Sequence, residues 1–182
     1  VAGLLALRGG AGDDVLRVMA GVSTADGSLT ATRLRGLGMA EGLADAGSRG
    51  IDYGDIETLA ITLGSGGGVF TLAATSPASA LTTLDALAGD HHIVVGRNPD
   101  NTDPATNDDL RDMHGRLVVA SDVGDTMELA SDVASRLTLA RQGAGGQLTG
   151  TDLPGSIAFG ALGQLTISQG AAGDAFTLDG NA

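Results

Sequence analysis

Carboxylates are the side chains of this chain best suited to chemistry, and they are densest between residues 96 and 116. This stretch contains Asp103, the adjacent pair Asp108 and Asp109, and then His114. Two carboxylates on either side of a glycosidic bond can act as general acid and general base. In a coiled β structure such residues come from successive coils, about 20 residues or more apart. Here they fall within one short stretch, so the spacing predicts no catalytic pair and the chain is not expected to be an enzyme.

Two further patterns could bind a nucleotide or a metal. The stretch GSGGGVF (64–70) is rich in glycine, but Val69 stands where a dinucleotide-binding loop has its third glycine, and no Lys-Ser or Lys-Thr pair follows. His91 and His92 are adjacent, and adjacent side chains of a strand point to opposite faces, so they cannot readily chelate one ion. We expect neither kind of site here.

Composition restricts the classes of partner. The 182 residues carry a net charge of −12, with no lysine, no cysteine and no tryptophan. An acidic chain without a basic stripe is not expected to bind nucleic acid, and the absence of a long apolar run predicts no membrane insertion. Because the chain begins at Val1 and ends just after a strand-like segment, we expect it to be part of a longer protein.

Glycine–aspartate turns recur along the chain, each before a short alternating segment. The fullest copy is GGAGDDVLR (residues 9–17), and similar turns place aspartates at Asp14, Asp125 and Asp174. Comparable turns have Gly68 and His91 at this position. Asp in such a turn commonly accepts hydrogen bonds from nearby backbone, so this is one interpretation of all three aspartates.

The nonapeptide resembles the G-G-x-G-x-D-x-U-x unit of RTX-like, haemolysin-type repeat proteins, and the chain as a whole looks like the degenerate glycine–aspartate β-solenoid arrays of large secreted or surface proteins. The resemblance implies calcium as a cofactor, with Asp14, Asp125 and Asp174 as candidate ligands. Calcium takes six to eight oxygens, which a β-roll collects from consecutive turns. The turns of this chain are not consecutive, so we expect no continuous calcium ladder.

Internal repetition is visible at long range. IDYGDIETLAITLGSGGGVFTLAAT (51–75) aligns without a gap with IAFGALGQLTISQGAAGDAFTLDGN (157–181), which matches Tyr53 with Phe159 and Phe70 with Phe176. The predicted organisation is accordingly a first repeat (1–95), a polar linker or protruding loop (96–115) and a second, truncated repeat (116–182).

The segments between turns alternate apolar with small polar residues, which is typical of strands with one buried face. Two stretches could instead form helical turns: residues 79–89, with leucines at every third position, and the alanine-rich residues 38–47. The sequence predicts an all-β fold, a right-handed parallel β-solenoid. Two tandem immunoglobulin-like β-sandwiches are the alternative, since a repeat near one hundred residues also suits that domain.

These features predict a structural module of a long extracellular or cell-surface rod, filament or adhesin stalk. Its partners would be adjacent repeats or further copies of itself, joined end to end through open sheet edges. A calcium-stabilised module that binds carbohydrate or another surface is the first alternative, and a polysaccharide-active β-helix enzyme is the second.

Overall fold

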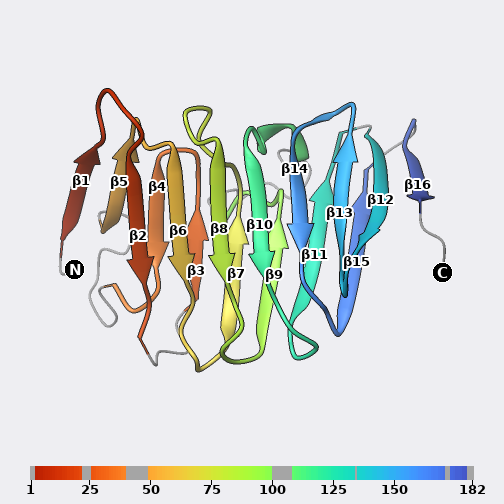
Figure 1. The fold of residues 1–182 in the computed structure, drawn as a ribbon, viewed down its shortest axis with the longest axis horizontal. Coiled ribbons are helices and arrows are strands. Elements are labelled where there is room, and N and C mark those ends of the chain that lie inside the picture. Colours follow the sequence, from red (N-terminus) through yellow and green to blue (C-terminus); the bar gives the residue numbers. More distant parts are fainter. Residues whose placement is uncertain are drawn as a thin grey trace.

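The computed structural model describes residues 3–21, 26–39, 49–99, 108–133, 135–170 and 173–179. Within these residues the regular elements are sixteen strands and one short 3-10 helix, η2 (Leu110–Asp112). The all-β class predicted from the sequence is confirmed, as two mixed sheets that do not close into a barrel. Figure 1 shows the two sheets facing each other along the length of the molecule.

Each sheet contains eight strands. Sheet A has, in spatial order, β1 (Leu4–Arg8), β5 (Gly50–Gly54), β4 (Arg33–Gly36), β3 (Gly27–Leu29), β7 (Gly68–Leu72), β9 (His91–Val95), β11 (Thr126–Ser131) and β15 (Gln164–Gln169). Sheet B has β2 (Val15–Met19), β6 (Thr58–Thr62), β8 (Leu81–Asp85), β10 (Arg116–Ala120), β14 (Leu153–Phe159), β13 (Gly145–Gly150), β12 (Arg136–Gln142) and β16 (Ala175–Asp179).

The chain passes from one sheet to the other through most of its length, so that β6 to β11 alternate between sheets B and A. Strands that become neighbours in this way run parallel, as in β6–β8–β10 and β7–β9–β11. Immunoglobulin-like sandwiches are built from antiparallel sheets. The parallel pairing described here is therefore not that of two tandem immunoglobulin-like domains.

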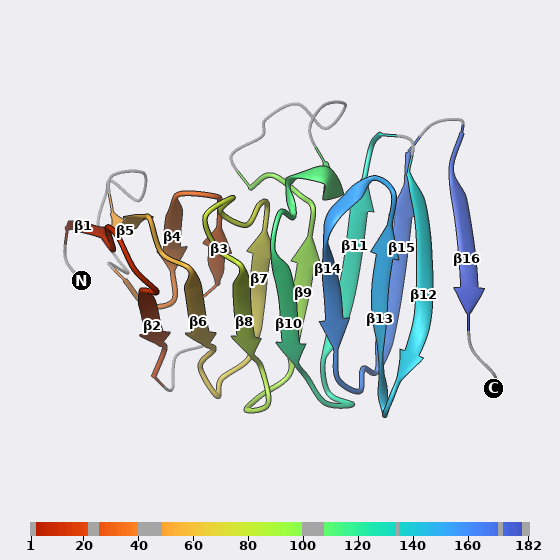
Figure 2. The ribbon, with the colours of Figure 1, turned by 45° about the horizontal axis from the view of Figure 1, so that its top comes forward.

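Two antiparallel meanders interrupt the alternation. In sheet A, β3, β4 and β5 run back toward the start of the molecule, and in sheet B, β12, β13 and β14 do the same. Each meander ends beside an earlier strand of its sheet, β5 against β1 and β14 against β10, both in parallel. Figure 2 shows the two meanders on opposite sheets.

The pairing pattern of strands β1 to β7 recurs in strands β10 to β16, with sheets A and B exchanged. Leu34 pairs with Ile51 in the first set, and Leu148 pairs with Ile157 in the second. The same correspondence holds for β3 with β7 and β12 with β16, where Leu29–Leu72 matches Leu139–Leu178. The residues aligned in the sequence thus occupy matching places in the pairing pattern. The first set is referred to below as the first half and the second set as the second half.

The matching aromatic positions differ in exposure. Phe70 on β7 is 1% exposed, whereas Phe176 on β16 is 39% exposed. β7 has a further neighbour, β9, while the last strand of sheet B in the described chain is β16. The difference follows from the missing neighbour of β16 and not from a different register.

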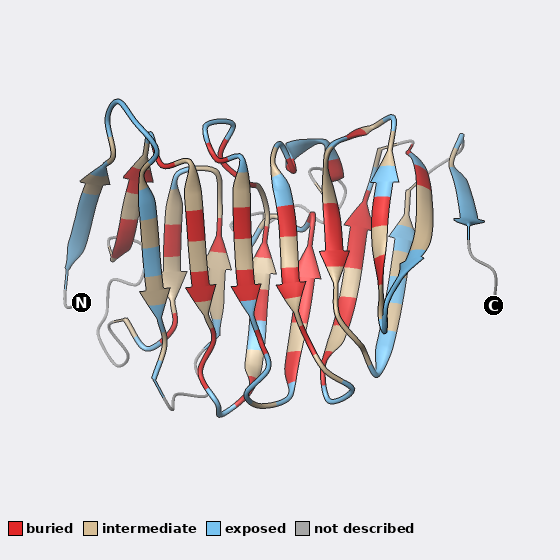
Figure 3. Ribbon diagram, in the orientation of Figure 1, coloured by how far each residue is buried: buried red, intermediate tan, exposed pale blue. Residues whose placement is uncertain are grey.

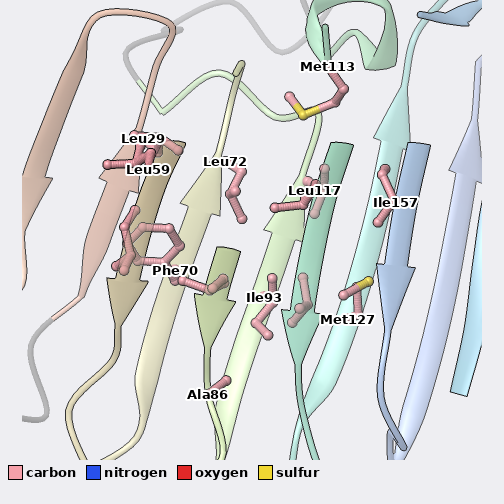
Figure 4. Close-up of a cluster of buried hydrophobic side chains, with 14 of the residues drawn as sticks. Leu29, Leu59, Phe70, Leu72, Ala86, Ile93, Met113, Leu117, Met127 and Ile157 are labelled. Atoms are coloured by element: carbon pink, nitrogen blue, oxygen red, sulfur yellow. The ribbon is translucent and has the colours of Figure 1, made fainter. Parts of the chain in front are cut away.

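The core lies between the sheets and is filled mainly by aliphatic side chains, as Figure 4 shows for the central strands. It forms one cluster from Leu29 to Ile157, so both halves share it. Buried residues alternate with less buried ones along strands such as β6, where Leu59 and Ile61 are buried. This is the period-2 pattern expected of strands with one buried face.

Parts of the segment between the halves belong to this core. Residues 100–107 of the predicted 96–115 linker lie outside the described residues. Of the described part, Leu110 and Met113 are buried in the shared core. The stretch 79–89, which could have been helical, contains β8, because its residues pair with both β6 and β10. Most of the alanine-rich stretch 38–47 lies outside the described residues.

Candidate functional site

The structure places the three candidate calcium ligands at the start of three separate strands. Asp14 precedes β2 at one end of sheet B, Asp125 precedes β11 in sheet A, and Asp174 precedes β16 at the other end of sheet B. They are not brought together. Within the described part of the chain, no group of three or more acidic, histidine or cysteine side chains is arranged to hold a metal ion.

Two of the three carboxylates accept hydrogen bonds from backbone N–H groups. The N–H groups of His91 and Asp122 donate to the two oxygens of Asp125, both at 2.9 Å, and the carboxylate is fully buried. The N–H of Ser135 donates to Asp174 Oδ1 at 2.7 Å. Each aspartate thereby satisfies a backbone N–H at the start of a neighbouring strand, at His91 in β9 and at Ser135 directly before β12. Oxygens engaged in this way fit a structural role better than calcium coordination.

Asp14 differs from the other two. Its Oδ2 is buried without a hydrogen-bond partner, and its own N–H donates to Glu57 Oε2 at 2.8 Å. A Cβ at Gly9 would lie 2.7 Å from Asp14 Oδ2 and 2.0 Å from the Asp55 carbonyl oxygen, so the absence of a side chain there leaves room for both. These oxygens are fewer than the six to eight that calcium prefers. A weak cation site at Asp14 remains a prediction.

The histidines and the carboxylates of the central segment are also engaged locally. His91 is buried with Nε2 3.0 Å from the Gly64 carbonyl oxygen, whereas His92 lies outside the core with Nδ1 2.9 Å from Thr126 Oγ1. Asp109 accepts hydrogen bonds from the backbone and the guanidinium of Arg111 at the start of η2. Asp103 lies outside the described residues.

A different cluster, which the sequence analysis missed, gathers on the outer face of sheet A. Arg8, Thr30, Thr32, Arg33, Arg35 and Asp52 line a pocket of about 410 Å³. We call it the arginine pocket. Its charged residues come from β1, β4 and β5, and they alternate with the inward residues Leu34, Ile51 and Tyr53.

Asp52 lies at the centre of the charges in the arginine pocket. Arg33 donates to both of its oxygens through a two-point contact, with Arg33 Nη2 3.0 Å from Asp52 Oδ2. This hydrogen bonding, together with the positive charges of Arg33, Arg8 and Arg35, holds the pKa of the Asp52 carboxyl below its usual value, although partial desolvation acts in the opposite direction. Three guanidinium groups thus act on one carboxylate.

Arg8 reaches the pocket across a glycine. A Cβ added at Gly54 would lie 3.3 Å from both Cδ and Nε of Arg8, so the arginine lies directly over the bare backbone of β5. The alternation of Arg33 and Arg35 along one strand is visible in the sequence, but Arg8 joins them only through the parallel pairing of β1 with β5. No local pattern could have indicated that meeting.

Comparisons with known proteins give no assignment: no protein-family model, no curated protein and no solved structure matches this chain. Among the described residues, no helix has the length and apolar character needed to cross a bilayer.

Proposed function

We propose that this chain is a structural module of a long extracellular or cell-surface assembly, such as a rod, filament or adhesin stalk, and that it carries no catalytic activity. In this proposal the two sheets form the flattened walls of a right-handed parallel β-solenoid. Successive modules stack end to end along its axis, either as neighbouring segments of one polypeptide or as separate copies.

The direction of the edge strands carries the proposal. At one end of the described chain the sheets finish with β1 and β2, and at the other end with β15 and β16. Within sheet A, β1 and β15 point the same way, because the two antiparallel steps of the meander cancel, and the same holds for β2 and β16 in sheet B. A second copy shifted along the axis would therefore place β1 beside β15 and β2 beside β16, both in parallel.

Apolar exposure at these ends supports the same arrangement. Six large apolar side chains that are exposed among the described residues belong to the edge strands β1, β2 and β16: Leu4, Leu5, Val15, Met19, Phe176 and Leu178. In Figure 3, β16 is pale blue and β1 mostly so, while the central strands are banded in red and tan. Unpaired edges with apolar side chains favour strand addition.

The pairing of β7 with β9 shows what covering an edge such as that of β16 would do. Phe70 is 1% exposed where β9 covers β7, and its counterpart Phe176 is 39% exposed on the uncovered β16. A strand added to β16 would bury Phe176 and Leu178 in the same manner. Full burial of such a side chain contributes about 1.5–3 kcal/mol.

Sedimentation of the purified chain over a concentration series tests the proposal, because stacking predicts a mass that rises with concentration. Leu178→Lys places a charge on the inward side of the β16 edge, and it should weaken association at least tenfold, equivalent to about 1.4 kcal/mol or more. Val123→Lys is the matched control, since Val123 is 77% exposed and Leu178 74%, and Val123 lies in a turn away from both ends.

A mixing experiment tests the polarity of stacking. Leu5→Lys blocks the β1 end and Leu178→Lys blocks the β16 end, so neither variant should form chains alone. Mixed together they should form a dimer through their two intact ends, since a head-to-tail interface joins unlike surfaces. A wild-type chain that stays monomeric at every concentration would refute the proposal. The proposal would also be refuted if Leu178→Lys and Val123→Lys weakened self-association equally.

A further inference from the structure

The arginine pocket concentrates positive charge on an acidic protein. The chain has a net charge of −12 and ten basic residues, all arginines. Three of these ten line the pocket, and among the described residues of its lining Asp52 is the one acidic residue. These described residues therefore carry three positive charges and one negative charge. A concave site of this kind attracts anions against the repulsion of the rest of the surface.

The fold itself does not require these charges. The second half builds the same three-stranded meander in the same register, where Gln147 pairs with Ala158 as Arg33 pairs with Asp52. The residues at the four matching positions are all neutral: Ala120 for Arg8, Gln147 for Arg33, Thr149 for Arg35 and Ala158 for Asp52. A purely architectural role would apply to both meanders, so the charges of the first one call for another explanation.

We propose that the arginine pocket binds the acidic group of an anionic sugar, a carboxylate or a sulfate carried by a polysaccharide. The planar fork of a guanidinium matches either group with two parallel hydrogen bonds. The inference does not depend on the assembly proposed above, because a single chain forms the whole pocket.

A sugar fits this lining better than a bare ion. The volume of about 410 Å³ is far larger than a simple inorganic anion needs. Beside the arginines the lining offers Asp52, whose carboxylate accepts hydrogen bonds, and two threonines. An acidic sugar presents an anionic group and hydroxyl donors on one ring, so it can use both kinds of lining residue.

None of the described residues that line the pocket is aromatic, so they offer no stacking on a sugar ring. Binding must come from charge and hydrogen bonds at a solvent-exposed site. We therefore expect the affinity to fall as salt concentration rises, since exposed charges are screened within about 10 Å at moderate ionic strength.

The test is calorimetric titration of the chain with three probes: an oligogalacturonate, a sulfated oligosaccharide, and inorganic sulfate alone. We expect at least one of the two oligosaccharides to bind more tightly than inorganic sulfate, and which one binds identifies the acidic group. The double variant Arg33→Gln and Arg35→Thr uses the residues that the second half has at the same positions, so it should fold and lose at least tenfold in affinity. Arg141→Gln, on sheet B, makes the same charge change outside the pocket and should bind as the wild type does.

Circular dichroism checks that each variant is folded. If the double variant is not, Arg8→Ala replaces it, because Arg8 lies on the edge strand β1 and matches Ala120. The inference is wrong if neither oligosaccharide binds, if inorganic sulfate binds as tightly as both, or if Arg141→Gln loses as much affinity as the pocket variants. It is also wrong if the pocket variants lose self-association in place of sugar binding, because the pocket would then hold a carboxylate of a second copy.

Discussion

Tyr53 shows how a single side chain can report on the whole fold. Its ring is 1% exposed and its hydroxyl donates to the Thr30 carbonyl oxygen at 2.6 Å. Burial raises the pKa of the Tyr53 phenol, because the charged phenolate is poorly stabilised away from water. The chain has one tyrosine and no tryptophan, so tyrosinate absorbance observes this residue alone.

The raised pKa predicts how stability depends on pH. In the unfolded chain the phenol ionises near its ordinary pKa of about 10, whereas the folded chain keeps it neutral to higher pH. The contribution of Tyr53 to the free energy of unfolding is therefore complete below pH about 10. It is lost as the pH rises above this value, since only the unfolded state releases the proton. Tyrosinate absorbance and circular dichroism, followed together during an alkaline titration, should change in one shared transition.

Tyr53→Phe provides the control, and the molecule already has phenylalanine at the matching position, Phe159. The variant should lose this alkaline pH dependence. At neutral pH it should also lower the free energy of unfolding by about 1 kcal/mol, because the Thr30 carbonyl loses its donor. Urea denaturation measures this as a lower midpoint with an unchanged slope. A phenol that ionises at its ordinary pKa while the β signal is intact would contradict the buried position of Tyr53.

At the scale of elements, the meanders depend on glycines that allow strands to approach closely. A Cβ at Gly36 would lie 2.0 Å from the Asp26 carbonyl oxygen, and one at Gly150 would lie 2.3 Å from the Arg136 carbonyl oxygen. Gly36 also has a positive φ of 75°, which side chains disfavour. The two glycines occupy matching places, paired with Gly27 and Leu137.

Alanine at either position should destabilise the chain by about 1–3 kcal/mol, the usual cost of forcing extra volume into a packed site. Thermal and urea denaturation of Gly36→Ala and Gly150→Ala test this. Gly21→Ala is the control, because a Cβ there meets nothing within 4 Å, and it should leave stability nearly unchanged. If Gly21→Ala destabilises the chain as much as the other two variants do, close approach of the strands does not explain the glycines at positions 36 and 150.

The same scale explains why local pattern can mislead. Leu81, Leu84 and Leu87 are spaced as in a helical turn, yet Leu81 and Leu84 lie on β8 and Leu87 is 56% exposed beyond it. β8 pairs with β6 on one side and β10 on the other. Backbone hydrogen bonds to two neighbours, together with burial of Leu84, outweigh a weak local preference for helix.

At the scale of the whole molecule, the shared core predicts that folding does not depend on calcium. One apolar cluster joins both halves, and Asp125 and Asp174 accept hydrogen bonds from backbone N–H groups. The chain should therefore give a β-rich circular dichroism spectrum in chelator. A weak site at Asp14 would add at most about 2.7 kcal/mol at a hundredfold excess of calcium over its dissociation constant.

Thermal melts with and without calcium measure this contribution, and Asp14→Ala should remove part of any shift. Self-association through the edge strands β1, β2, β15 and β16 should persist in chelator, since strand addition uses backbone hydrogen bonds and apolar side chains. A chain that is unfolded in chelator and becomes a compact monomer in calcium would overturn this expectation.

The sequence by itself determined the all-β class, because alternation of apolar and small polar residues has the period of a strand with one buried face. It also indicated which segments correspond, such as the regions around Tyr53 and Phe159. These are local properties, because they depend only on residues that follow one another along the chain.

Only the tertiary structure decided how the strands pair. The backward meanders, the exchange of sheets between the two halves and the meeting of Arg8 with Arg33, Arg35 and Asp52 all depend on contacts between distant parts of the chain. A strand's side-chain pattern specifies which face is buried but not which neighbour it joins, since any strand with the same alternation satisfies the same backbone hydrogen bonds. For that reason the arginine pocket, unlike the strands that hold it, could not be predicted from the sequence.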